Sequence, residues 1–160
     1  MKVGASVCAS SGFNALKFLD LARLEKITWY SGVPTMHQAI LLRANKNKEA
    51  AKNLNLRLIR SSSASLPPAV FKDLNEAFNC PVIEAYGMTE ATHQMTSNPL
   101  PPKQQKAGFV GLPAGPEVCI MSENGDMMKQ GEEGEVCIKG KNVTLGYENN
   151  EEANKTSFTN

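Results

Sequence analysis

The segment from Glu84 to Ser97, EAYGMTEATHQMTS, holds the residues whose types and spacing best suit chemistry. It begins as a strand and reaches Thr89 and Glu90, which have the form of a helix start. A threonine hydroxyl beside the unpaired N–H groups of a helix N-terminus can bind a phosphate oxygen. The Glu90 carboxylate can hold Mg²⁺ against that phosphate, the ring of Tyr86 can stack on a purine, and Gly87 lets the backbone approach a ligand closely. Together these groups could form a site for a nucleotide and its magnesium ion.

Each of these side chains also has an ordinary structural explanation. A Thr-Glu pair after a strand most often caps a helix, because the helix dipole favours a glutamate in the first turn. Taken alone, the pair therefore favours capping over metal binding. His93 could be a histidine packed on a helix face, and Arg60 could bind a substrate or, as we favour, a nearby carboxylate. His37 is interpreted as a structural or surface residue.

Alternating strand and helix patterns must position this segment. Strands are predicted at 2–8, 27–30, 56–60 and 81–85, and helices at 14–25, 35–44 and 68–78, the last two beginning near Pro34 and Pro68. Strands that alternate with helices over short connections indicate an α/β fold, in which crossover helices join parallel strands. Ligands of such sheets lie beyond the carboxyl ends of the strands. Here those ends are the turn Ser61–Ser65 and the turn Tyr86–Glu90.

The pattern changes after the proline-rich polar segment 98–108, NPLPPKQQKAG. Short strands follow at 117–121 and 134–139, with an Asn-Gly turn signal at Asn124-Gly125 between them. This part is typical of a small antiparallel sheet or barrel. We predict a partial α/β lobe over residues 1–104 and a partial β-barrel lobe over residues 105–160.

Composition and charge exclude several classes of protein. The 17 Lys and Arg residues nearly balance the 16 Asp and Glu residues, whereas a protein that binds nucleic acid or an anionic membrane usually clusters positive charge. No apolar run approaches the length of a membrane span. The four cysteines, Cys8, Cys80, Cys119 and Cys137, have no zinc spacing and suit reduced thiols.

Five motifs occur in the order known for one family. They are Gly32-Val33-Pro34-Thr35-Met36, Ser61 to Leu66 (SSSASL), Tyr86 to Glu90 (YGMTE), Gly108 to Pro113 (GFVGLP) and Gly134-Glu135-Val136. YGMTE resembles the Y-G-x-T-E motif of the adenylate-forming enzymes, which include acyl-CoA synthetases, luciferases and peptide-synthetase adenylation domains. The other four resemble motifs of the same family. The chain is therefore identified as a member of the family, covering the second α/β lobe and the barrel lobe of its N-terminal domain.

The resemblance implies roles for residues at the matching positions. It implies catalytic roles for Thr89 and Glu90, with Glu90 as the Mg²⁺ ligand. It implies that the nucleotide contacts Ala64, Ser65, Glu84, Ala85, Tyr86 and Thr89, and that the acid substrate contacts Ser61, Ser63, Gly87, Met88 and His93. ATP, Mg²⁺ and, as a substrate, CoA follow from the family, as does a cytoplasmic or peroxisomal location.

A finer resemblance points to the oxalate–CoA ligases of plants and fungi. It rests on Arg60 to Leu66, on Glu84 through Met95, on Ser97 to Pro101 and on Asn142 to Tyr147. Oxalate is a small dianion, so its pocket needs hydrogen-bond donors rather than a long apolar tunnel. Ser61, Ser63 and His93 could supply such donors. A fatty or hydroxycinnamic acid remains the alternative substrate.

Several family parts are absent from the sequence: the phosphate loop that ends in lysine, the T-G-D segment and the C-terminal domain with its lysine. We therefore expect this chain to be an internal piece of a longer enzyme and inactive alone. Its partners would be the acid, ATP, CoA and the remaining segments of the same enzyme. A sheet cut within its domain exposes edges that other segments cover, so we also expect weak stability or self-association. A non-catalytic nucleotide-binding or interaction module is the alternative from another class.

Overall fold

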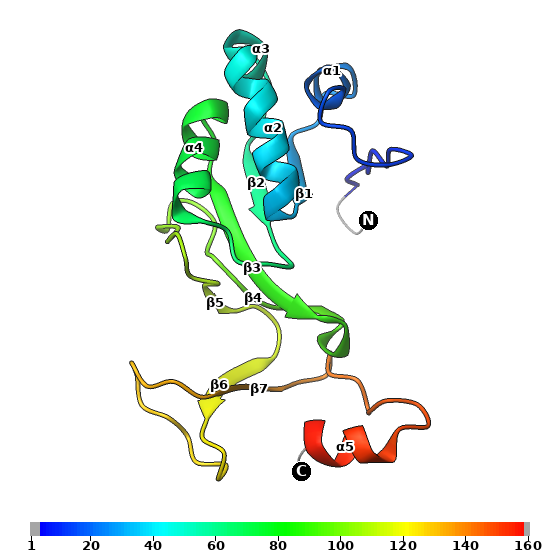
Figure 1. Ribbon diagram of the computed structural model, residues 1–160, viewed down its shortest axis with the longest axis vertical. Coiled ribbons are helices and arrows are strands. Elements are labelled where there is room, and N and C mark those ends of the chain that lie inside the picture. The colour runs from blue at the N-terminus through cyan, green and yellow to red at the C-terminus, as the bar shows by residue number, and fades with distance from the viewer. Residues whose placement is uncertain (1–3, 159–160) are drawn as a thin grey trace.

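Three parallel strands and two antiparallel ones form the main sheet of the computed structural model, which describes residues 4–158 (Figure 1). The sheet order is β1-β2-β3-β4-β5, and a separate two-stranded sheet pairs β6 with β7. In chain order the elements are α1 (Phe18–Leu24), β1 (Trp29–Gly32), α2 (Pro34–Lys46), α3 (Lys48–Lys52), β2 (Leu58–Ser61), α4 (Pro68–Phe78), β3 (Val82–Met88), η1 (Thr89–Ala91), β4 (His93–Ser97), β5 (Leu112–Pro113), β6 (Glu117–Met121), β7 (Glu135–Lys139) and α5 (Glu151–Ser157).

The predicted α/β fold is confirmed. Strands β1, β2 and β3 are parallel neighbours in the order of the sequence, joined by crossovers through α2 and α4. Right-handed crossovers between neighbouring strands place their helices on one face of the sheet, and α2 and α4 lie together there (Figure 1). Pro34 and Pro68 occupy the first turns of these helices, as predicted. The residue before α2 is the extended Val33, so Thr35 is not its cap.

The core lies between these helices and the sheet. Its largest fully buried side chains include Ile40 of α2, Ile59 of β2, and Leu74 and Phe78 of α4. The opposite face is open at β1, where burial alternates and Trp29 remains 45% exposed, but it is covered at β3, where Val82 to Ala85 are all buried. β1 is an edge strand of this sheet, and the expectation that exposed edges make the chain weakly stable or self-associating stays a prediction.

The first predicted strand is not formed over its described residues, 4–8. Lys2 lies outside the described residues, and the segment from Gly4 to Cys8 is irregular and exposed. A lone extended segment has no neighbour to bond its N–H and C=O groups, so its apolar composition alone cannot make it a strand. The predicted helix at 14–25 is also shorter, because α1 covers only Phe18–Leu24.

The predicted helix after Thr89 is replaced by a single 3₁₀ turn and a strand. Thr92 and His93 have φ angles of 52° and 82°, and a right-handed helix cannot continue through two left-handed residues. The chain therefore reverses, and β4 pairs antiparallel with β3 from Ala85↔Ser97 to Met88↔His93. β5 pairs antiparallel with β4, so the sheet is mixed rather than wholly parallel.

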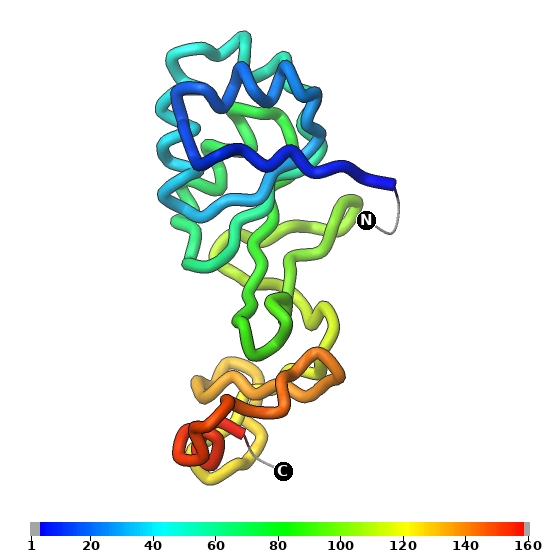
Figure 2. The backbone as a smooth tube through the Cα atoms, turned by 90° about the vertical axis from the view of Figure 1, so that its right-hand side faces the viewer, coloured from blue at the N-terminus to red at the C-terminus, as the bar shows by residue number. Residues whose placement is uncertain are grey.

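The second part of the chain contains the predicted small antiparallel sheet. β6 and β7 pair from Glu117↔Lys139 to Met121↔Glu135, with Cys119 opposite Cys137. This hairpin and α5 lie below the α/β lobe (Figure 2). All four cysteines are free thiols. No helix within residues 4–158 is long and apolar enough to cross a membrane.

His37 is buried in the core and should make stability depend on pH. Its Nδ1 lies 3.2 Å from the Tyr30 hydroxyl, and burial lowers the pKa of His37 to about 4. An unfolded histidine titrates near pH 6.5. The unfolded chain therefore binds more protons between these values, and stability is lost as the pH falls from about 6.5 toward about 4.

We expect the free energy of unfolding to drop by about 2 kcal/mol between pH 7 and pH 5 because of His37 alone. The measurement is urea denaturation at both pH values, followed by the fluorescence of Trp29, the single tryptophan of the chain. His37→Gln should remove most of this difference, whereas His93→Gln, at the other histidine, should retain it. An equal pH difference in wild type and His37→Gln would contradict the assignment.

Candidate functional site

The predicted catalytic pair lies at the tip of the β3–β4 hairpin. Thr89 is exposed and Glu90 is partly exposed, both within η1. Because η1 has only three residues, it lacks the aligned free N–H groups of a longer helix, and the helix-terminus argument for a phosphate site no longer holds. The roles of Thr89 and Glu90 therefore depend on the resemblance and on the surroundings of Glu90.

Two bonds from the segment after β7 hold Glu90. The Tyr147 hydroxyl donates to Glu90 Oε1 at 2.7 Å, and the Thr144 N–H donates to the Glu90 carbonyl oxygen at 2.8 Å. The Tyr147 bond lowers the pKa of Glu90 and raises that of Tyr147. Glu90 is thus an ionised carboxylate at neutral pH. Sequence reasoning missed Tyr147, because nothing local links residues 57 positions apart.

A partly exposed carboxylate of this kind fits a magnesium ion bound together with a nucleotide. Tyr147 bonds Oε1, which leaves Oε2 of Glu90 available. Within residues 4–158 no group of three or more His, Cys, Asp or Glu side chains is placed to hold a metal ion. Magnesium commonly takes one or two carboxylates, with substrate phosphates and water completing its shell. Glu90 could therefore contribute one ligand to such an ion.

The serine-rich turn follows β2 at the carboxyl end of the parallel strands. Ser61 and Ser62 are buried, and their hydroxyls have no hydrogen-bond partner within the described residues. Ser63 has a φ angle of 74° and begins an exposed stretch that includes Ala64 and Ser65. The turn therefore offers both exposed donors and buried hydroxyls without partners, which a bound ligand could engage.

Glu84 ties the serine-rich turn and a later loop to β3. Its side chain is 4% exposed, with Oε1 accepting the Gly108 N–H at 2.7 Å and Oε2 accepting the Leu66 N–H at 3.4 Å. Both carboxylate oxygens therefore already bond the main chain, and a nucleotide contact of Glu84 stays a prediction. Of its predicted companions, Ala85 is buried and Tyr86 is 36% exposed.

The predicted residues form two groups along β3. Ser61 lies opposite Glu84, whereas His93 lies opposite Met88, nearer the tip of the hairpin. Arg60 spans the sheet between them, donating to Ser31 Oγ at 3.1 Å and to Gln94 Oε1 at 3.4 Å. Within residues 4–158, Arg60 is therefore bonded to a hydroxyl and an amide oxygen and not to the carboxylate that we favoured. His93 is exposed and lies on β4, so its interpretation as a packed helix residue is wrong.

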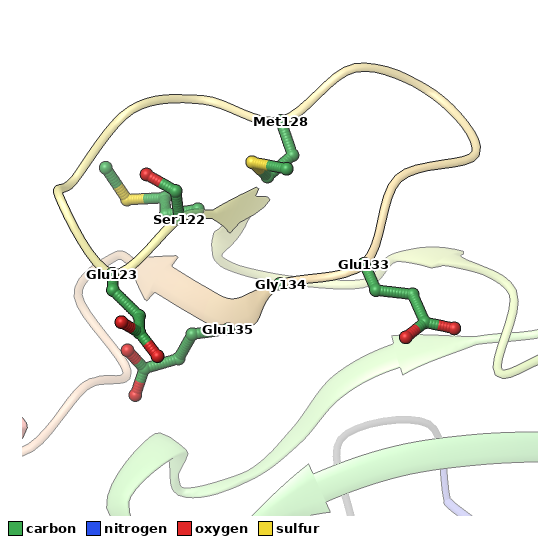
Figure 3. A pocket seen from close by; sticks show the side chains of 7 residues that line it. Ser122, Glu123, Met128, Glu133, Gly134 and Glu135 are labelled. Atoms are coloured by element: carbon green, nitrogen blue, oxygen red, sulfur yellow. The ribbon is translucent and has the colours of Figure 1, made fainter.

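A cavity of about 490 Å³ lies away from these groups, at the end of the β6–β7 hairpin. Met121, Ser122 and Met128 line it together with three glutamates (Figure 3). The carboxylates of Glu123 and Glu135 lie close to one another in this view, with Glu133 apart. An acidic lining repels a polyphosphate, and none of the predicted site residues lines this cavity.

Comparison with known proteins identifies the family. The AMP-binding enzyme family matches residues 1–148, nearly the whole chain. The chain belongs to the AMP-binding enzyme family. It is 49% identical over 158 residues to the oxalate–CoA ligase of Arabidopsis thaliana and 46% identical over 154 residues to that of Saccharomyces cerevisiae. These matches cover 97% and 96% of this chain but 30% and 28% of the two ligases, so the chain spans about 30% of the length of these relatives.

A solved structure shows the same arrangement of the chain. The ATP-bound structure of MatB from Rhodopseudomonas palustris superposes with a TM-score of 0.81 at 31% identity. The match covers 92% of this chain and 29% of MatB. The mixed sheet and the small antiparallel sheet are therefore the fold of this region in AMP-binding enzymes.

Proposed function

We propose that this chain is part of an ATP-dependent acid–CoA ligase whose acid is oxalate. The observation that carries the proposal is the identity of 49% and 46% to two oxalate–CoA ligases over nearly the whole chain. Because the chain spans about 30% of their length, activity belongs to the longer polypeptide that also carries the rest of the fold, called the complete enzyme below. We place the complete enzyme in the cytosol or the peroxisome, and the four free thiols suit either compartment.

The proposed reaction has two steps. The acid carboxylate attacks the α-phosphorus of ATP, forming an acyl-adenylate and releasing pyrophosphate; the CoA thiol then attacks the acyl carbon and displaces AMP. Both steps need reactants that are held in line and charge that is stabilised on phosphate. The exposed hydroxyl of Thr89 can donate to a phosphate oxygen, and Glu90 can hold the magnesium ion that accompanies ATP.

Residues of both groups along β3 would contact the substrates. We propose that adenosine contacts Ala64, Ser65, Ala85 and Tyr86, with Glu84 setting the backbone around it. The acid would lie between the serine-rich turn and the hairpin tip, where Ser61, Ser63, Gly87, Met88 and His93 surround it. Hydroxyl and imidazole donors suit a dianion that carries no apolar tail, and the buried Ser61 hydroxyl still lacks a partner.

Pyrophosphate exchange in the complete enzyme tests the proposal. We expect exchange to be fastest with oxalate, compared with hexanoate and coumarate, and to need magnesium. His93→Asn should lower exchange with oxalate by tenfold or more, because a hydrogen bond to a charged group contributes about 1.5–3 kcal/mol. Asparagine suits this position as a test because it tolerates the φ angle of 82° at His93.

The other outcomes favour the two alternatives. Exchange with hexanoate or coumarate but not with oxalate would keep the family and replace the acid. No exchange with any acid, with the phosphate loop and C-terminal domain present, would favour the non-catalytic module. Equal exchange with oxalate in wild type and His93→Asn would remove His93 from the acid site.

A further inference from the structure

We propose that Tyr147 is a positioning residue, which holds the Glu90 carboxylate in the orientation that binds the magnesium–nucleotide complex. The inference rests on the proposed function, because it assumes that Glu90 is the magnesium ligand. It assigns a role to the segment 142–147, called the latch below. The latch lies after β7 and outside the nucleotide and acid contacts described above.

The latch makes hydrogen bonds to each of the residues 90, 91 and 92. Besides the two bonds to Glu90, the Thr92 hydroxyl donates to the Asn142 carbonyl oxygen at 2.7 Å, and Asn142 Nδ2 donates to the Ala91 carbonyl oxygen at 2.8 Å. Figure 1 shows this segment passing directly beneath the tip of the β3–β4 hairpin. A three-residue 3₁₀ turn has few bonds of its own, so these contacts define its position.

Tyr147 is itself fixed by the last helix. Asn154 of α5 bonds the main chain of Tyr147 twice: Oδ1 accepts its N–H at 2.6 Å, and Nδ2 donates to its carbonyl oxygen at 2.9 Å. The Tyr147 ring meets Phe158 edge to face, with centroids 5.5 Å apart. A side chain on the preceding Gly146 would press on Asn154, since its Cβ would lie 3.0 Å from Oδ1. The hydroxyl therefore reaches Glu90 from a supported position.

The chemistry of a phenol suits this task better than that of a cation. Its neutral O–H donates one bond to Oε1 and orients the carboxylate while leaving the negative charge for the metal. A lysine or arginine would compensate that charge and weaken the attraction for Mg²⁺. Partners that orient a metal ligand in this way typically change metal affinity by 10–100-fold when they are removed.

The test is Tyr147→Phe in the complete enzyme, because this change removes the hydroxyl and keeps the ring against Phe158. Mn²⁺ binding is measured by electron paramagnetic resonance in the presence of α,β-methylene-ATP, which cannot react. We expect the Kd for Mn²⁺ to rise about tenfold, with the metal-free affinity for the nucleotide unchanged. The magnesium concentration that gives half-maximal exchange should rise by a similar factor.

Tyr30→Phe is the matched control, since it also removes a hydroxyl that makes a hydrogen bond, to His37 in the core. It should leave the Kd for Mn²⁺ unchanged. If a general loss of stability caused the effect, the Kd for Mn²⁺ would rise in both variants. That result would overturn the proposal.

Glu90→Gln separates this inference from the proposed function. If Tyr147 acts through Glu90, the double variant Glu90→Gln/Tyr147→Phe should bind Mn²⁺ no more weakly than Glu90→Gln alone. Weak Mn²⁺ binding by Glu90→Gln with normal binding by Tyr147→Phe would overturn the role of Tyr147 and keep Glu90 as a ligand. Normal binding by Glu90→Gln would overturn the metal role of Glu90 and the inference with it.

Discussion

Replacing Gly87 with alanine should reduce oxalate-dependent pyrophosphate exchange in the complete enzyme by about a hundredfold or more. The added Cβ would overlap the carbonyl oxygen of His93 and lie 3.1 Å from the Cα of Gln94. Both obstacles belong to the backbone of β4, which cannot turn aside as a flexible side chain does. The two strands must separate where Gly87 faces Gln94, and a displacement of about 1 Å in a catalytic site can cost about 10²-fold in rate.

This substitution should act through position, because it removes no side chain and the added Cβ would meet the backbone of β4. Separation of β3 from β4 moves His93 and, through η1, both Thr89 and Glu90. Hydrogen exchange should accordingly become faster in peptides covering residues 86–97 and remain slow in α2 and α4. Rate and local exchange are thus two independent readouts of the same displacement.

Gly32→Ala provides the comparison on the same sheet. The three atoms nearest to its Cβ would all belong to the ring of the His37 side chain, the first at 3.1 Å. A ring can shift by a few tenths of an ångström, so we expect this variant to keep most of its exchange activity. If Gly87→Ala retained more than a tenth of wild-type exchange, close packing of the hairpin would not set the geometry of the site.

The parallel part of the fold could be predicted because its signals are local. Pro34 and Pro68 mark helix starts, and short apolar runs before, between and after these helices mark β1, β2 and β3. β6 was predicted with its observed bounds, Glu117–Met121. The Asn124-Gly125 turn also forms, but it bridges Met121 to Met127 rather than joining β6 directly to β7. An Asn-Gly pair specifies an immediate reversal and says nothing of which later strand the chain meets.

The wrong predictions concern backbone conformations and contacts that depend on distant segments of the chain. The run after Thr89 resembles a helix start, and only the left-handed backbone at Thr92 and His93 turns it into a hairpin. Neither residue type requires that conformation. It is stabilised by bonds to the latch, such as that from the Thr92 hydroxyl to Asn142. The contact between Tyr147 and Glu90 likewise depends on how two distant segments pack, which no spacing in the sequence encodes.

The variants Gly111→Ala and Gly125→Ala should differ strongly in stability, although the two glycines have almost the same φ angle. Their φ angles are 84° and 83°, so alanine should be strained equally at both, by about 1–2 kcal/mol. A Cβ on Gly125 would meet nothing within 4 Å, whereas one on Gly111 would overlap the carbonyl group of Ser97 and the nitrogen of Asn98. We expect Gly111→Ala to lower the free energy of unfolding by about 3 kcal/mol more than Gly125→Ala does. Crowding a packed site commonly costs about 1–3 kcal/mol, and here the crowded atoms belong to the backbone, which moves less easily than a side chain.

The local disruption in Gly111→Ala should affect the nucleotide site through Glu84. The Gly111 backbone packs against the end of β4, and Gly108 on the same loop donates its N–H to the Glu84 carboxylate. Loss of that packing should release Gly108 and with it one of the bonds that hold Glu84 in place. Hydrogen exchange at residues 105–113 and the Kd for ATP in the complete enzyme are the two measurements. Faster hydrogen exchange with an unchanged Kd for ATP would show that Glu84 organises the fold but not the nucleotide site. Faster hydrogen exchange together with a higher Kd would show that Glu84 organises both.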